Sequence, residues 1–186
     1  MQASRSIYHY LLVVLLWSLG VVPSQGAGNA DTGRIEARLE ELGIALPEAP
    51  SAVATYAPYK VVGNLVYIAG QGPMDDGITE CRGKVGSDVT KEQGYQCARL
   101  TGLVILAQLK AACGGDLDRV VQGVKIGGFV NTAPGFTDYP FVINGASDLF
   151  VDVFGKRGLA ARFAVGAASL PFNIPVEIDA VFEIKE

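Results

Sequence analysis

The chain has 186 residues, of which 49% are hydrophobic and 18% charged, and its formal net charge is −4. This length and composition are typical of one globular domain with a single core rather than of a disordered chain. Its 15 lysines and arginines form no block in the sequence, which disfavours electrostatic binding of nucleic acid because phosphate neutralisation needs a clustered basic face.

The N-terminal segment is typical of a secretory signal peptide. Residues 1–10 carry one arginine and no acid, residues 11–22 form the apolar run "LLVVLLWSLGVV", and small and polar residues follow. That run falls short of the about 20 apolar residues that a membrane span needs. We expect a signal peptide over residues 1–30, cleaved near 26–30, and an exported mature chain, periplasmic or secreted, without a stable membrane span. An uncleaved anchor, or a mis-assigned start codon on a cytoplasmic protein, is the alternative.

Turn and periodicity signals along the rest of the chain predict alternating strands and helices. The first expected elements are a short helix over 34–42 and two strands around the turn at 63–64, the second of them over 65–69. A long helix follows, which begins at Ser87, Asp88 or Thr90 as possible caps and ends at the glycines 114–115. The last expected elements are a strand within 117–133, a second long helix from about 140 to 155, and two strands within 159–184. Apart from the short first helix, the predicted order is β-β-α-β-α-β-β.

This order predicts an α+β fold in which two helices pack on one face of a single sheet. The strand residues expected on the other face are mostly apolar or small. A sheet face of this kind is rarely left to water, so we expect other subunits to cover it.

Cysteine and histidine usage limits the possible chemistry. Cys81, Cys97 and Cys113 are odd in number, so one stays free or pairs between chains. Cys97 and Cys113 fall on one predicted helix, about 24 Å apart, and cannot bridge each other. No cysteine pair has metal-ligand spacing, and the only histidine, His9, precedes the mature chain. We therefore expect no histidine-based triad and no metal site.

Two charges in the last two strands bear on function. Arg162 is the only charge in its strand, and alternation places it on one face with Ala164, Gly166 and Ala168, which leaves empty volume beside the guanidinium. If these strands form a hairpin that turns near 170–173, Arg162 shares a face with Glu177. The pair is then either a cross-strand ion pair on a solvated face, or a carboxylate-binding arginine with an acid/base partner beside a cavity.

Two motifs carry a family resemblance. The pattern R-x-x-V-x-x-A-x-L-P-x-x-x-x-V-E-I-x-A spans Arg162 to Ala180, and G-N-L-V-Y-I-A-G-Q-x-P spans Gly63 to Pro73. With these motifs the chain, over 31–186, resembles the Rid family, the RidA-type or YjgF-like imine and enamine deaminases also called endoribonuclease L-PSP. The resemblance implies a chorismate-mutase-like fold, a homotrimer with sites at the subunit interfaces, and hydrolysis of reactive 2-imino or enamine acids to 2-oxo acids and ammonia without a cofactor.

The resemblance also implies residue roles. Arg162 matches the arginine that holds the substrate carboxylate, and Glu177 matches the glutamate that positions or activates water. Tyr56, Gly70 and Asn144 fall at pocket positions of the family. From pattern alone, the tyrosine is equally well an ordinary strand aromatic, the asparagine a helix surface residue, and the glycine a strand terminator.

Three residues depart from the family pattern. Phe163 stands where the family often has serine or threonine, Ala164 replaces a pocket-facing cysteine, and Ala69 replaces a serine. These changes predict a pocket that is less polar and slightly larger. The alternative function is a non-catalytic trimer that binds small carboxylates or acts as a chaperone-like interaction module. A ribonuclease is disfavoured by the charge.

Overall fold

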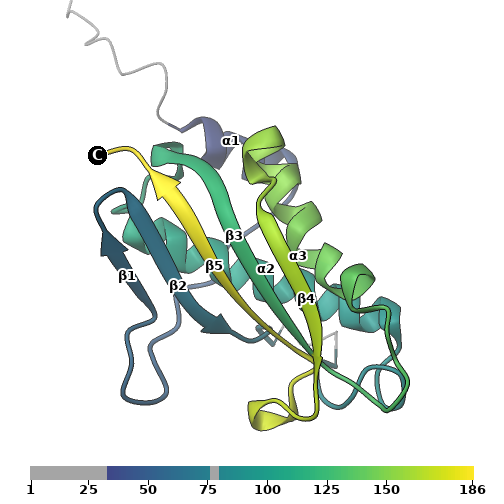
Figure 1. Ribbon diagram of the computed structural model, residues 1–186. Coiled ribbons are helices and arrows are strands. Elements are labelled where there is room, and N and C mark those ends of the chain that lie inside the picture. The colour runs from purple at the N-terminus through teal and green to yellow at the C-terminus, as the bar shows by residue number, and fades with distance from the viewer. Residues whose placement is uncertain (1–32, 76–79) are drawn as a thin grey trace, which may run out of the picture. The chain divides into compact units, whose positions relative to one another are not determined.

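The computed structural model describes residues 33–75 and 80–186 (Figure 1). The expected signal peptide over residues 1–30 lies outside the described residues. None of the helices in the described ranges combines the length and the hydropathy that a membrane crossing requires.

Five strands form one mixed sheet in the order β1-β2-β5-β3-β4 (Figure 1). The strands are β1 Tyr59–Val62, β2 Leu65–Gln71, β3 Val120–Asn131, β4 Ala161–Ala167 and β5 Val176–Ile184. Strands β3 and β4 run parallel, and the other neighbours run antiparallel. The predicted α+β class and the order of elements are confirmed.

Helices α2 Lys91–Ala112 and α3 Tyr139–Phe154 lie side by side on one face of the sheet, and α1 Arg34–Glu41 packs against α3 (Figure 1). The connections also contain three short 3-10 helices, η1 Leu117–Arg119, η2 Gly155–Gly158 and η3 Pro171–Asn173. Helix α2 begins at one of its predicted caps, because the Thr90 side chain accepts a hydrogen bond from the backbone N–H of Gln93 and the Gln93 side chain accepts one from the backbone N–H of Thr90.

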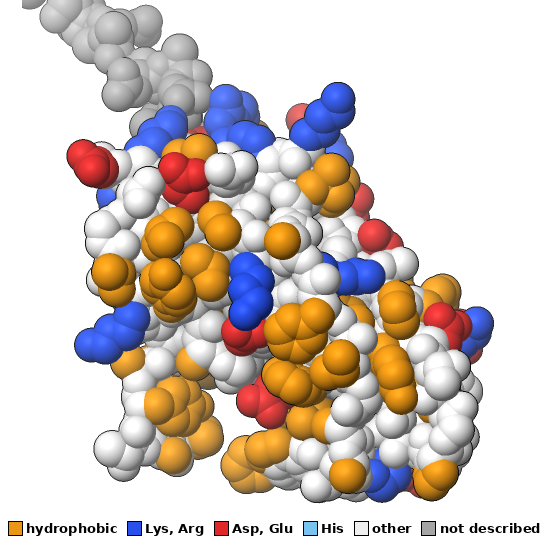
Figure 2. Space-filling view, viewed as in Figure 1, with side chains coloured by type: hydrophobic (Ala, Val, Ile, Leu, Met, Phe, Trp, Pro, Cys, Tyr) orange, Lys and Arg blue, Asp and Glu red, His pale blue; other side chains and the backbone are white. Residues whose placement is uncertain are grey.

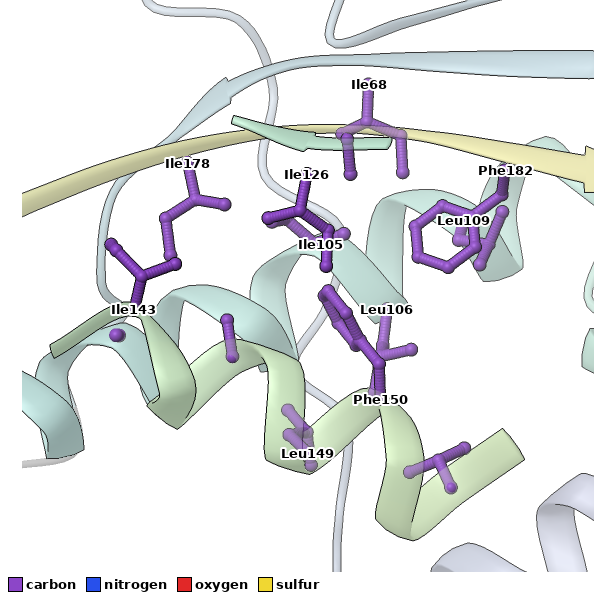
Figure 3. Packing of buried hydrophobic residues seen from close by; sticks show 14 of the residues in the cluster. Ile68, Ile105, Leu106, Leu109, Ile126, Ile143, Leu149, Phe150, Ile178 and Phe182 are labelled. Carbon is purple, nitrogen blue, oxygen red and sulfur yellow. The ribbon is translucent and has the colours of Figure 1, made fainter. Parts of the chain in front are cut away.

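The hydrophobic core fills the space between the sheet and the two long helices. Figure 3 shows Ile126 and Phe182 of the sheet pointing toward Ile105 of α2 and Phe150 of α3. The rings of Phe150 and Phe182 meet edge to face with centroids 5.5 Å apart. Burying each such side chain contributes about 1.5–3 kcal/mol. The core therefore fixes which face of each strand points inward, and the alternate residues of β5, including Glu177, point to the open face.

The hairpin expected for the last two strands is wrong, because β3 lies between β4 and β5. Arg162 pairs with Ile126, whose side chain is buried against the helices, whereas Glu177 pairs with Phe129, which is exposed on the open face. Arg162 and Glu177 therefore lie on opposite faces of the sheet, contrary to the shared face that the hairpin implied. The physical reason is the parallel β3–β4 pair, whose crossover through α3 brings β4 to the far edge of the sheet.

The face of the sheet away from the helices carries exposed hydrophobic side chains. Tyr67, Phe129 and Val165 are 46%, 40% and 41% exposed, respectively. Figure 2 shows hydrophobic side chains gathered in groups on this face, with acidic and basic side chains between them. Its apolar character agrees with the sequence-based expectation, and its coverage by other subunits stays a prediction.

The cysteine pairing left open by the sequence is resolved by a disulfide. Cys81, in the segment before α2, is joined to Cys97 within that helix. Cys113 is free and buried at the end of the same helix. Burial raises the pKa of the Cys113 thiol to about 11, which makes it a poor nucleophile near neutral pH.

Candidate functional site

Glu177 would have to move its carboxylate if Gly70 carried a side chain. On the open face of the sheet, its carboxylate lies against the backbone of Gly70 in β2, and a Cβ atom at Gly70 would overlap Glu177 Oε1. Burial is the main cause that raises the pKa of Glu177 above its usual range, and the negative charge of Asp179 adds to the effect. A raised pKa makes the Glu177 carboxylate a stronger base than an exposed glutamate.

A cavity of about 650 Å³ adjoins Glu177 and Gly70. Tyr56 lines it as well, so three of the predicted site residues come together here. Apolar residues make up much of the remaining wall, among them Pro50, Val53, Met74, Phe172 and Ile174. This cavity, whose wall is mostly apolar with polar groups from several segments, has the size and lining of a small-molecule site.

Arg162 lies at a second place, where β4 meets α3. Its Nη1 donates to Asn144 Oδ1 at 2.8 Å and to Ser147 Oγ at 2.9 Å, and its Nη2 donates to the carbonyl oxygen of Pro140 at 3.4 Å. Ala164 follows on the same face of β4. Arg162, Asn144 and Ala164, all predicted, thus form a second cluster. The sequence interpretation missed Ser147, although its place one helical turn after Asn144 is a signal that could have found it.

The single chain does not bring Arg162 and Glu177 together. Two strand spacings of about 4.8 Å and three residues at about 3.3 Å each put their Cα atoms roughly 14 Å apart. Their side chains also point to opposite faces, and Arg162 does not line the cavity beside Glu177. No small 2-oxo or 2-imino acid can touch both residues within one chain. Each chain therefore carries two separate groups of the predicted site residues.

Asp179 is a second carboxylate on the open face of β5. Its Oδ1 is buried and accepts no hydrogen bond, and it occupies the space that Gly127 leaves open on β3. Asp179 and Glu177 are two residues apart on one strand face, and the Asp179 charge is the second cause that raises the pKa of Glu177. The sequence interpretation gave Asp179 no role.

Three carboxylates lie close enough together to be compared with a metal site. None of them belongs to the cavity beside Glu177 or to the Arg162 cluster. Ligand oxygens of Glu36, Asp116 and Asp118 lie within 4.8 Å of one another. Asp118 Oδ2, however, accepts hydrogen bonds from the backbone N–H groups of Arg34 and Ile35, and Lys110 Nζ lies 3.5 Å from Glu36 Oε1. These contacts give the cluster a structural role in holding the start of α1.

The fold and the two groups define a small α+β protein with an apolar small-molecule cavity. Comparison with protein families agrees: residues 36–182 match the family described as "YjgF/chorismate mutase-like, putative endoribonuclease". The chain therefore belongs to the YjgF family, which includes the RidA-type proteins. The family resemblance drawn from the two motifs is confirmed.

Individual relatives give more detail. Protein TCP17 of Trypanosoma cruzi is 43% identical over 155 residues, which cover 83% of this chain and 96% of that protein. A 2-iminobutanoate/2-iminopropanoate deaminase of Dermatophagoides farinae is 27% identical over 142 residues, 76% of this chain and 95% of its own. A crystal structure of an Agrobacterium tumefaciens protein of unknown function superposes with a TM-score of 0.76 at 47% identity, covering 83% of this chain and 95% of that one.

Proposed function

We propose that the protein hydrolyses reactive 2-imino or enamine acids to 2-oxo acids and ammonia, at sites formed between the subunits of a homotrimer. The observation that carries the proposal is the division of the site residues into two groups. Arg162 and Asn144 lie at the β4–α3 edge, and Glu177, Gly70 and Tyr56 lie at the cavity. The deaminase name of the Dermatophagoides farinae relative supports the reaction class.

One observation and one symmetry argument support assembly. The open face of the sheet exposes Tyr67, Phe129 and Val165, and large apolar patches of this kind mark interfaces between subunits. In a cyclic oligomer, each subunit presents one surface to one neighbour and a different surface to the other. The Arg162 group of one subunit then meets the Glu177 group of the next, and every interface completes one site.

Arg162 anchors the substrate in this scheme. A guanidinium has five N–H donors, and three of the Arg162 donors contact Asn144, Ser147 and Pro140. The N–H of Nε and one N–H of Nη2 make none of these contacts, which leaves two donors for a carboxylate. The contacts to α3 hold the guanidinium plane, so the substrate carbon is oriented before reaction.

Glu177 moves the protons. The imino acid reacts as its iminium form: a water oxygen bonds to the carbon, the C=N π electron pair moves to nitrogen, and Glu177 accepts a water proton, which gives a tetrahedral aminoalcohol. The same carboxyl group then donates that proton to the amino nitrogen, the C–N bond breaks as ammonia leaves with the bonding electron pair, and the hydroxyl proton passes to the Glu177 carboxylate as the carbonyl of the 2-oxo acid forms. The raised pKa of Glu177 favours the first step, since it makes the carboxylate a stronger base than an exposed glutamate.

Ammonia release from freshly generated 2-iminobutanoate tests the proposal. The wild type should raise the rate above spontaneous hydrolysis. Glu177→Gln should keep binding of 2-oxobutanoate but lose turnover, because an amide cannot carry the proton. If the wild type binds 2-oxobutanoate yet releases no ammonia above the spontaneous rate, the alternative of a non-catalytic carboxylate-binding or chaperone-like trimer is supported instead.

We also propose that the mature chain works outside the cytosol. The sequence of residues 1–30 predicts a signal peptide, and the disulfide between Cys81 and Cys97 supports export, since disulfides persist in oxidising compartments.

A further inference from the structure

The cavity beside Glu177 is large for the smallest imino acids. Its volume of about 650 Å³ equals the share of roughly twenty water molecules in the liquid, whereas a three-carbon acid displaces only a few. Pro50, Val53 and Ile174 line it, so a small polar substrate would leave most of the apolar wall in contact with water. Apolar walls gain most from an apolar occupant, because contact removes both surfaces from water.

Phe172 is held in an unusual conformation at this cavity. Its φ of 54° and ψ of 14° place it in the left-handed region, where a bulky residue is an outlier, and Asn173 follows with a φ of 58°. The Phe172 side chain lines the cavity and is 72% exposed, so packing within the chain does not offset the backbone strain. Strain of this kind gathers where a segment contacts a ligand.

The small residues beside Glu177 also favour an apolar occupant of the cavity. Ala69 lines the cavity beside Gly70, and neither residue offers a side chain that hydrogen-bonds a ligand. The polar side chains of the cavity are those of Glu177, Tyr56, Gln71, Ser51 and Glu48, and the backbone supplies the polar groups next to Glu177. A substrate that enters here is recognised by the polar groups at its imino end and by apolar contact over the rest.

We propose that the substrates are 2-imino acids with a large apolar side chain, of leucine, methionine or phenylalanine size, and that this side chain occupies the cavity under Phe172. The inference rests on the proposed function and deepens it. Phe172 is then a specificity-determining residue, which contacts the substrate away from the reacting carbon. Asn173 shares the left-handed backbone of Phe172.

Relative kcat/KM values test this inference. Imino acids are generated in place from alanine, leucine, methionine and phenylalanine by an amino-acid oxidase with catalase, and ammonia release above the spontaneous rate is measured. Each buried methylene corresponds to about a fourfold gain. The three extra carbons of leucine over alanine would give roughly sixtyfold if fully buried, and we expect at least about tenfold because the cavity is partly open.

The variant Phe172→Gly removes the side chain without destabilising the fold, so a change in its substrate preference is not caused by misfolding. Glycine adopts the left-handed backbone without strain, so this variant should fold at least as well as the wild type. Its kcat/KM should fall much more for the leucine-derived than for the alanine-derived imino acid. Val53→Phe, which fills the cavity, should shift the preference in the same direction. Leu159→Ala removes a similarly exposed apolar side chain, 67% exposed, away from the cavity and should change neither value.

The outcomes are distinguishable. If the alanine-derived imino acid is the best substrate, or if Phe172→Gly leaves the ratio unchanged, the inference is overturned while the proposed function stands. If light scattering shows that Phe172→Gly separates the subunits, Phe172 is an interface residue and its assignment to specificity is wrong. If the assembled wild type accelerates none of these reactions, the proposed function itself fails.

Discussion

Replacing Arg162 by alanine should weaken binding of a 2-oxo acid without unfolding the protein. The available Nε and Nη2 protons offer two charge-assisted hydrogen bonds, each worth about 1.5–3 kcal/mol. Because Arg162 is exposed in the single chain, residual water discounts the sum to about 2–4 kcal/mol. That free energy corresponds to binding about 30- to 900-fold weaker. Arg162→Lys keeps the charge but loses the planar pair of donors, so its affinity should be intermediate.

Calorimetry with 2-oxobutanoate measures the change, and a second arginine supplies the control. Arg157 Nη1 donates to the carbonyl oxygen of Val120 at 2.7 Å and has no place in the proposed site. Arg157→Ala should therefore lower the melting temperature and leave the affinity unchanged. If Arg162→Ala instead binds like the wild type while its melting temperature falls, Arg162 is a structural residue and the proposed anchor is wrong.

Three further outcomes are expected. Asp179→Asn removes a charge that raises the pKa of Glu177, so the acid limb of the kcat profile should move to lower pH, and a limb at unchanged pH would refute the coupling. Cys81→Ser opens the disulfide, whose cysteines are 16 residues apart, and should cost about 3 kcal/mol in chemical unfolding, whereas a stability equal to the wild type would contradict the bridge. Mass spectrometry of the native protein should find an N-terminus between Ala27 and Asp31, and an intact Met1 would refute export.

Local signals in the sequence predicted the elements well. Thr90 and Gln93 form the capping box at the start of α2 from residues three positions apart in the sequence. Apolar residues alternate with other residues along 176–184, and they are the buried face of β5. The pairing of strands is different, because it depends on contacts between distant segments. Nothing local in 159–184 shows that β3 separates β4 from β5, so the hairpin was wrong although both strands were placed correctly.

For the candidate site, the sequence likewise identified the residues but not their relative positions in space. The motifs identified Arg162 and Glu177, and alternation correctly put the arginine on the face it shares with Ala164. Their spatial relation followed from the wrong hairpin and was wrong with it. A pocket was predicted, but its position beside residues 47–53 and the strained Phe172 could not be foreseen, since both depend on where the connection 168–175 lies in the fold.

Mixed trimers test the central claim most directly, that Arg162 of one subunit acts with Glu177 of the next. Arg162→Ala and Glu177→Gln should each be inactive alone. After denaturation and refolding of an equal mixture, an interface has both intact residues in about one case in four, so the mixture should regain about a quarter of the wild-type ammonia release. If both residues acted within one chain, no subunit of the mixture would be intact, and a mixture as inactive as its components would contradict the account.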